Sequence, residues 1–182
     1  MKKLFLTVLL AGAGFVAQAQ KNTLLVYGNL GVNATKSPVD VKATSFEFSP
    51  GVGYQFTDNW TAGMNVSAKT WKNGVPAVKS STFGVGPFVR YAYPLSDIFA
   101  IFGQFNANYV SGKYGDTKTN GFQGEIFPAI GVNLKNGFAL NFSFGSLGLT
   151  TTKVKGMSSA STDFGLNFGS GAGFGISKNF GL

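Results

Sequence analysis

The chain of 182 residues is long enough for one domain with its own core, but only 12% of its residues are charged. An ordinary soluble domain carries roughly 25% charged residues, so this composition fits poorly with a surface fully exposed to water. The balance of 15 basic against 7 acidic residues is strongly basic, and the lack of cysteine excludes disulfides, thiolate metal sites and a lipid anchor on cysteine.

The first 19 residues have the pattern of a secretory signal peptide. Lys2 and Lys3 precede an apolar run, 4–16, which is followed by Ala17-Gln18-Ala19. A basic start, a short apolar segment and an A-x-A site are the parts of such a signal. The run is too short for a membrane-spanning helix, which needs roughly 20 residues. We therefore expect cleavage after Ala19 and a mature domain of residues 20–182.

A period of two dominates the rest of the sequence. In SFEFSPGVGYQF, residues 45–56, one set of alternate positions is apolar and the other is mostly Ser and Gly. Such alternation is typical of a β-strand with one apolar face. The pattern predicts eight strands, in chain order, over about 23–33, 45–56, 60–69, 82–93, 98–109, 121–134, 138–149 and 163–180.

Two kinds of connection alternate between these strands. The short ones, 57–59, 94–97 and 135–137, contain the residues that tight turns prefer. The longer ones are polar and are predicted to be loops: 35–42, 70–79, 110–120 and 150–162. Short turns on one rim and longer loops on the other are typical of outer-membrane barrels, in which the short turns are periplasmic.

Two all-β architectures fit eight alternating strands. A soluble lipocalin-type barrel has its apolar side chains inside, and a transmembrane barrel has them outside. The polar positions favour the membrane, because they hold small Gly, Ser, Asn and Gln rather than the Lys and Glu expected on a solvated sheet face. Aromatic residues also gather beside the short turns, as in an interfacial girdle; they are Tyr54, Phe56, Trp60, Tyr91, Tyr93, Phe99 and Phe138.

Four charged residues fall on the polar side of the predicted strands: Glu47, Lys69, Arg90 and Glu125. In a transmembrane barrel these positions face the lumen, and a buried charge is tolerated only when it is paired and hydrogen-bonded. We therefore predict an ionic cluster of these four residues inside the barrel. The alternative is four unrelated surface charges.

With these features the chain resembles the small eight-stranded outer-membrane barrels of Gram-negative bacteria, the OmpA/OmpX-type transmembrane domain. The resemblance covers the whole mature chain, from AQAQ at the cleavage site through SPGVGYQF before a tight turn to the final GISKNFGL. It implies an all-β, eight-stranded antiparallel up-and-down transmembrane β-barrel in the outer membrane, with a polar or ionic network in the lumen. It also implies that Phe180 is the C-terminal aromatic signal read by the barrel assembly machinery, although Gly181 and Leu182 follow it.

The sequence offers little for catalysis. It contains no histidine, the usual base that activates a nucleophile at neutral pH. Asp40, Asp116 and Asp163 are too scattered to suggest a carboxylate pair, and no phosphate-binding glycine loop is present. We therefore predict a protein that is not an enzyme and that needs no cofactor or metal.

A basic rim is predicted on the side of the long loops, formed by Lys36, Lys42, Lys72, Lys79, Lys113, Lys118, Lys153 and Lys155. Lysines at this place could bind the phosphates of anionic lipopolysaccharide, or they could simply keep exposed loops soluble. Nucleic acid is not an expected partner at an outer-membrane location; membrane lipids are.

Three functions remain open at this point. The first is a non-enzymatic structural or interaction protein of the cell envelope, with a plugged lumen and basic loops. The second is a narrow channel for small or hydrophobic solutes, and the third is a secreted, lipocalin-like binding protein. Three phenylalanines at lumen positions favour a plugged interior: Phe88, Phe102 and Phe127. Gly84 and Gly86, by contrast, leave space.

Overall fold

The computed structural model describes residues 21–36, 42–74 and 77–182. Within these ranges it also describes the side chains, except those of residues 33–36, 42, 73–74, 77–78 and 170–172. The predicted signal peptide, residues 1–19, lies outside the described residues, as do positions 37–41 of the first predicted loop.

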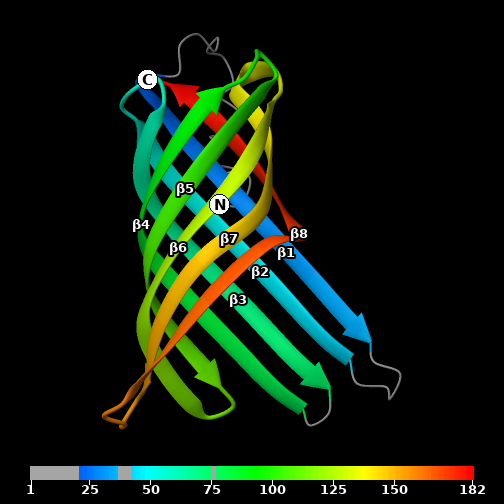
Figure 1. The fold of residues 1–182 in the computed structure, drawn as a ribbon, viewed down its shortest axis with the longest axis vertical. Coiled ribbons are helices and arrows are strands. Elements are labelled where there is room, and N and C mark those ends of the chain that lie inside the picture. The colour runs from blue at the N-terminus through cyan, green and yellow to red at the C-terminus, as the bar shows by residue number, and fades with distance from the viewer. Residues whose placement is uncertain (1–20, 37–41, 75–76) are drawn as a thin grey trace, which may run out of the picture.

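Eight antiparallel strands form a closed barrel in which each strand pairs with the next and β8 returns to β1. Figure 1 shows the strands inclined around a single cylinder. The predicted eight-stranded up-and-down barrel is confirmed. The strands are β1 (Thr23–Lys36), β2 (Lys42–Gln55), β3 (Trp60–Gly74), β4 (Ala77–Pro94), β5 (Phe99–Tyr114), β6 (Thr117–Asn133), β7 (Phe138–Val154) and β8 (Ala160–Gly181).

Short turns connect β2 to β3, β4 to β5 and β6 to β7, as predicted, and we call this the short-turn end of the barrel. In the first turn the Thr57 hydroxyl accepts a hydrogen bond from the backbone N–H of Trp60, at 2.9 Å. The third is a 3-10 turn, Lys135–Gly137 (η1), in which Asn136 adopts φ 62°. Thr and Asn suit these places because their side chains or backbones stabilise tight turns. β1 begins and β8 ends at this same end (Figure 1).

The prediction of long loops at the opposite end, which we call the hairpin end, is wrong. The strands continue through most of 70–79, 110–120 and 150–162. Between β5 and β6 only Gly115 and Asp116 remain as a turn, with Gly115 at φ 57°. These segments lack an apolar alternation, but 150–162 is rich in Ser and Thr, and β-branched Thr favours extended backbone once a neighbouring strand supplies hydrogen bonds.

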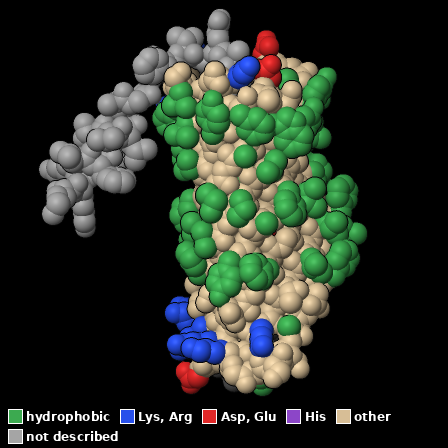
Figure 2. Space-filling model, turned by 90° about the vertical axis from the view of Figure 1, so that its left-hand side faces the viewer, with side chains coloured by type: hydrophobic (Ala, Val, Ile, Leu, Met, Phe, Trp, Pro, Cys, Tyr) green, Lys and Arg blue, Asp and Glu red, His purple; other side chains and the backbone are tan. Residues whose placement is uncertain are grey.

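The outer wall of the barrel is apolar. Phe46, Phe48, Val52 and Tyr54, the apolar set of β2, are each between 43% and 48% exposed. Figure 2 shows hydrophobic side chains spread over the middle of the wall and charged ones at its two ends. The aromatic residues predicted beside the short turns are exposed as well. This arrangement confirms the membrane-facing orientation and is the reverse of a lipocalin-type barrel. Among the described residues, no helix is long and apolar enough to span a membrane.

Candidate functional site

The lumen is filled with side chains near the short-turn end. Phe88 is only 1% exposed, and its ring meets Tyr27 edge to face with centroids 5.3 Å apart. A Cβ added at Gly53 would lie 2.7 Å from the Phe88 ring, and one added at Gly51 would overlap the Tyr27 ring. The glycines at these lumen positions therefore make room for two large rings. We call this layer the floor; its residues are Leu25, Tyr27, Phe88, Arg90, Phe102 and Gln104.

Arg90 is buried in the floor and is held by neutral partners. Its Nε and Nη2 atoms donate to Gln104 Oε1, at 2.8 and 2.6 Å. The guanidinium carbon lies 4.3 Å from the centre of the Phe102 ring and 4.8 Å from that of Tyr27. Gln104 Nε2 donates in turn to the Tyr27 hydroxyl and to Asn106, both at 2.8 Å. A cation at this depth is thus stabilised by an amide acceptor and two ring faces.

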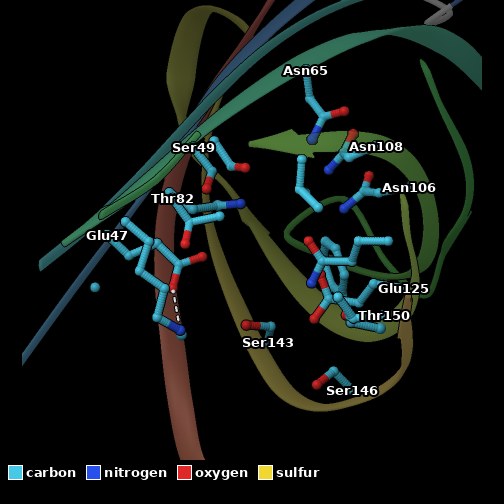
Figure 3. Close-up of a pocket in the computed structure, with 18 of the residues that line it drawn as sticks. Glu47, Ser49, Asn65, Thr82, Asn106, Asn108, Glu125, Ser143, Ser146 and Thr150 are labelled. Atoms are coloured by element: carbon cyan, nitrogen blue, oxygen red, sulfur yellow. Dashed lines mark ion pairs between the residues drawn. The ribbon is translucent and has the colours of Figure 1, made fainter. Parts of the chain in front are cut away.

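A cavity of about 580 Å³ occupies the lumen between the floor and the hairpin end. Tyr27 and Gln104 line its base, while Gly112 and Thr119 belong to its outer part, near the β5–β6 turn. We call this cavity the chamber. Figure 3 shows its polar lining of amides, hydroxyls and carboxylates, contributed by strands from around the barrel.

Three charged residues line the chamber. Lys69 Nζ lies 3.5 Å from Glu47 Oε2, the ion pair drawn as a dashed line in Figure 3. Their side chains are 59% and 47% exposed, so the pair is largely hydrated. Glu125 is hydrogen-bonded to Ser146 and lies within electrostatic range of both Glu47 and Lys69.

The predicted four-residue ionic cluster is therefore divided between two places. Glu47, Lys69 and Glu125 share the chamber, whereas Arg90 does not line it and its recorded partners are Gln104 and aromatic rings. Arg90 is thus not joined to the ion pair of Glu47 and Lys69, and a cluster of all four residues stays a prediction. Sequence analysis missed Gln104, although the register of β4 and β5 places it directly opposite Arg90.

The lysines of the predicted basic rim lie mainly on strands, on the outward side of the hairpins. Lys72 pairs with Lys79 across β3 and β4, and Lys113 pairs with Lys118 across β5 and β6. Lys36 and Lys42 also pair in the backbone register, but their side chains lie outside the described part. We call the exposed, described lysines the lysine girdle: Lys72, Lys79, Lys113, Lys118, Lys153 and Lys155.

The strand lysines of the girdle stand at a constant distance from the apolar wall. Each lies four positions beyond the last exposed apolar or aromatic residue of its strand, on the same face. The pairs are Ala68 and Lys72, Phe83 and Lys79, Tyr109 and Lys113, Phe122 and Lys118, and Leu149 and Lys153. Lys113 also forms an exposed ion pair of 3.6 Å with Asp116 in the turn. The positive charge thus forms a partial ring just outside the apolar band.

Phe180, the predicted assembly signal, lies on the outward side of β8 at the short-turn end. Lys178 lies between two rings there, with Nζ 4.5 Å from the centre of Phe138 and 4.8 Å from that of Phe180. A lysine at this place keeps its ammonium near the membrane surface while its stem covers aromatic rings. The position of Phe180 does not test its reading by the assembly machinery, which stays a prediction.

Among the described residues, no group of three or more His, Cys, Asp or Glu side chains could hold a metal ion. The groups of the chamber are amides, hydroxyls, two carboxylates and one ammonium. Such a set can bind a polar group by hydrogen bonds and charge.

Comparisons with known proteins agree with this geometry. A family model described as "Outer membrane protein beta-barrel domain" matches residues 5–182. A search of curated proteins gave no match. The crystal structure of Neisserial surface protein A (NspA) is similar with a TM-score of 0.51 and 14% identity, over 88% of this chain and 98% of that chain. The outer membrane protein Ail of Yersinia pestis matches at a TM-score of 0.37 and 12% identity, over 88% of this chain and 100% of that chain.

Proposed function

Because the chain belongs to the outer membrane protein beta-barrel domain family and is thus located in the cell outer membrane, we propose that it is a non-enzymatic, non-conducting structural and interaction barrel. Its lysine girdle contacts the anionic lipopolysaccharide of the outer leaflet. The observation that carries this proposal is the constant four-residue offset between the apolar wall and the lysines.

The offset corresponds to the depth of lipid head groups. Four residues of a strand span roughly 13 Å, which a tilt of about 40° reduces to roughly 10 Å along the membrane normal. The polar region of one leaflet is roughly 5 to 8 Å thick, and a lysine stem can bend back toward it. The ammonium groups can therefore reach phosphates just outside the hydrocarbon.

The cross-strand lysine pairs also favour a bound anion. Side chains directly opposite each other in antiparallel strands have Cβ atoms roughly 5 Å apart, and like charges there are destabilising. Lys72 with Lys79 and Lys113 with Lys118 have this arrangement. A phosphate bound between two such ammonium groups removes the repulsion, so an anionic leaflet stabilises the barrel more than a zwitterionic one.

The test compares the protein in nanodiscs of phosphatidylcholine with and without lipopolysaccharide. Lipopolysaccharide is expected to raise the temperature at which the folded band disappears on unboiled gels, and high salt should reduce this gain. The variant Lys72→Gln/Lys79→Gln/Lys113→Gln/Lys118→Gln should lose most of the gain. The control Lys21→Gln/Lys135→Gln, which removes charge at the short-turn end, should keep it. An equal rise of this temperature in both variants would refute contact between the lysine girdle and lipopolysaccharide.

The filled floor supports a barrel that does not conduct. Phe88, Phe102 and Gln104 are buried across the lumen, which supports a chamber that ends toward the short-turn end. The chamber itself favours the alternative of a narrow channel, because about 580 Å³ of the lumen is open. Planar-bilayer recording separates the two: the closed barrel predicts no steady current, and stable ohmic steps would support the channel.

Two further elements of the proposal concern biogenesis. Residues 1–19 direct export and are removed, and Phe180 presents the aromatic that the barrel assembly machinery reads. Phe180→Ala should reduce the amount of folded barrel in the outer membrane without changing the unfolding of barrel refolded in vitro. Unchanged membrane levels would exclude this role.

A further inference from the structure

The barrel is closed by an unusually short seam. β1 and β8 pair over eight residue pairs, from Thr23 opposite Gly181 to Leu30 opposite Phe174. β1 pairs with β2 over 14 residues and β7 with β8 over 15. Beyond Leu30 and Phe174 the two strands separate, and Figure 1 shows β1 and the first half of β8 running apart toward the hairpin end. The wall is therefore split in its outer half.

A change of register in β8 produces the split. From Phe168 to Gly173, β8 advances five residues while its partner β7 advances only two, from Gly145 to Ser143. Gly169 adopts φ 70° at the start of this irregularity. Extra residues in one strand bend it and increase its twist. The first half of β8 thereby remains paired with β7 and is separated from β1.

The chamber reaches the membrane through this split. Leu30 and Phe174 are on the lipid-facing side of their strands, yet both line the chamber together with Glu47 and Lys69. Apolar side chains beside the split are unusually exposed, with 71% for Phe164 and 67% for Val32. These positions pair with Leu149 and Phe46, which belong to the apolar wall. The opening thus lies at the level of the hydrocarbon, not at the hairpin tips.

Glu125, one of the two carboxylates that line the chamber, has no ion-pair partner within the described residues. Among the described residues, no cation lies within 4 Å of the Glu125 carboxylate, since Lys69 pairs with Glu47. A carboxylate without an ion-pair partner favours a group that is cationic and carries N–H donors.

We propose that the chamber binds a single-chain amphiphile with a primary ammonium head, which enters from the outer leaflet through the split between β1 and β8. The ammonium binds Glu125, and the alkyl chain passes beyond the Leu30–Phe174 pair, where the two strands separate, into the hydrocarbon. This site is independent of the lysine girdle, whose charge would repel such a head, so either proposal can fail alone.

The first test uses the wild-type barrel in phosphatidylcholine nanodiscs and a series of C12 probes. Dodecylamine should bind saturably and at least tenfold more tightly than dodecanol or dodecanoate, which share the chain but lack the ammonium. Binding is measured by calorimetry against empty nanodiscs, so that simple partitioning is subtracted. Equal affinity for dodecanoate, or no saturable binding of dodecylamine, would overturn the proposal.

The second test removes the carboxylate. Glu125→Gln keeps the shape of the side chain and should weaken dodecylamine binding at least tenfold. The matched control Asp97→Asn removes the same charge in the β4–β5 turn, at the short-turn end, and should leave binding unchanged. Both proteins are first checked for the folded band on unboiled gels. Equal weakening by the two variants, or no effect of Glu125→Gln, would contradict the assigned site.

The third test locates the alkyl chain. A dodecylamine analogue with a diazirine at the chain end is photolysed with and without excess dodecylamine, and crosslinked peptides are identified by mass spectrometry. The competed crosslinks should fall on β1 near Leu30 and on β8 near Phe174. Competed crosslinks at the β5–β6 turn instead would show entry from the aqueous end and refute the lateral path.

Discussion

The floor and the chamber lie in the same lumen and hold charges on the same face of the strands, but they stabilise them differently. In the floor, Arg90 is buried against Gln104 and two aromatic rings. In the chamber, Lys69 and Glu47 form an ion pair that remains about half exposed. A lumen charge is therefore stabilised by oriented neutral groups at depth, and by an opposite charge together with exposure near the opening.

This difference predicts that stability depends on the floor and hardly on the chamber. The floor groups are buried and are held by packing and hydrogen bonds, so each loss there leaves a void or an unpaired group. The charged groups of the chamber are partly exposed, so a group that loses its partner is hydrated by water instead.

The largest effect is expected for Phe88→Ala, which leaves a cavity beside Tyr27 where almost no surface is exposed. Loss of a buried Phe side chain costs about 3–5 kcal/mol. The measurement is urea unfolding of the refolded barrel, followed by tryptophan fluorescence. The control Tyr114→Ala, at the hairpin end, should change the free energy of unfolding by less than about 1 kcal/mol. Similar losses of unfolding free energy for Phe88→Ala and Tyr114→Ala would mean that the floor is not the core of the barrel.

A smaller loss, about 2–4 kcal/mol, is expected for Gln104→Leu, because Arg90 is then buried without its acceptor. The double variant Arg90→Met/Gln104→Leu removes both polar partners and should recover part of the loss. Unfolding of the two single variants and the double variant gives the coupling free energy. If the losses of unfolding free energy were additive, groups other than Gln104 would stabilise Arg90.

The smallest effect is expected in the chamber. If Glu125 belonged to the predicted ionic cluster, Glu125→Ala would leave a cation unpaired and cost a few kcal/mol. In the structure Lys69 keeps Glu47 as its partner, and Glu125 loses only its hydrogen bond to Ser146. The change in unfolding free energy should therefore be below about 1 kcal/mol. A loss as large as that of Gln104→Leu would break the distinction between the two regions.

The wall of the barrel could be predicted from the sequence because lipid imposes a strict alternation on it. Phe46, Phe48 and Val52 on one face and Glu47 on the other fix the orientation of β2, and the turn residues at 57–59 and 135–137 fix where strands end. Period and turn chemistry are local properties, so a single sequence carries them.

Features that depend on pairing between strands could not be predicted in this way. The polar segments 110–114 and 150–154 are strands because their hairpin partners supply hydrogen bonds, not because of their own pattern. The Arg90 site needs the register of β4 and β5. The split between β1 and β8 follows from extra residues near Gly169, which alternation does not reveal.

The division of the lumen into a closed floor and an open chamber is tested most directly by single cysteines, because the chain has none of its own. Ser49 lines the chamber, and Ser177 is buried in the layer of the floor, where its hydroxyl accepts a hydrogen bond from Asn141 at 2.9 Å. A membrane-impermeant thiol reagent is added to intact cells that carry Ser49→Cys or Ser177→Cys. The account predicts labelling of the Ser49→Cys variant at least tenfold faster than that of the Ser177→Cys variant. Equal labelling of the two, or protection of Ser49→Cys, would contradict it.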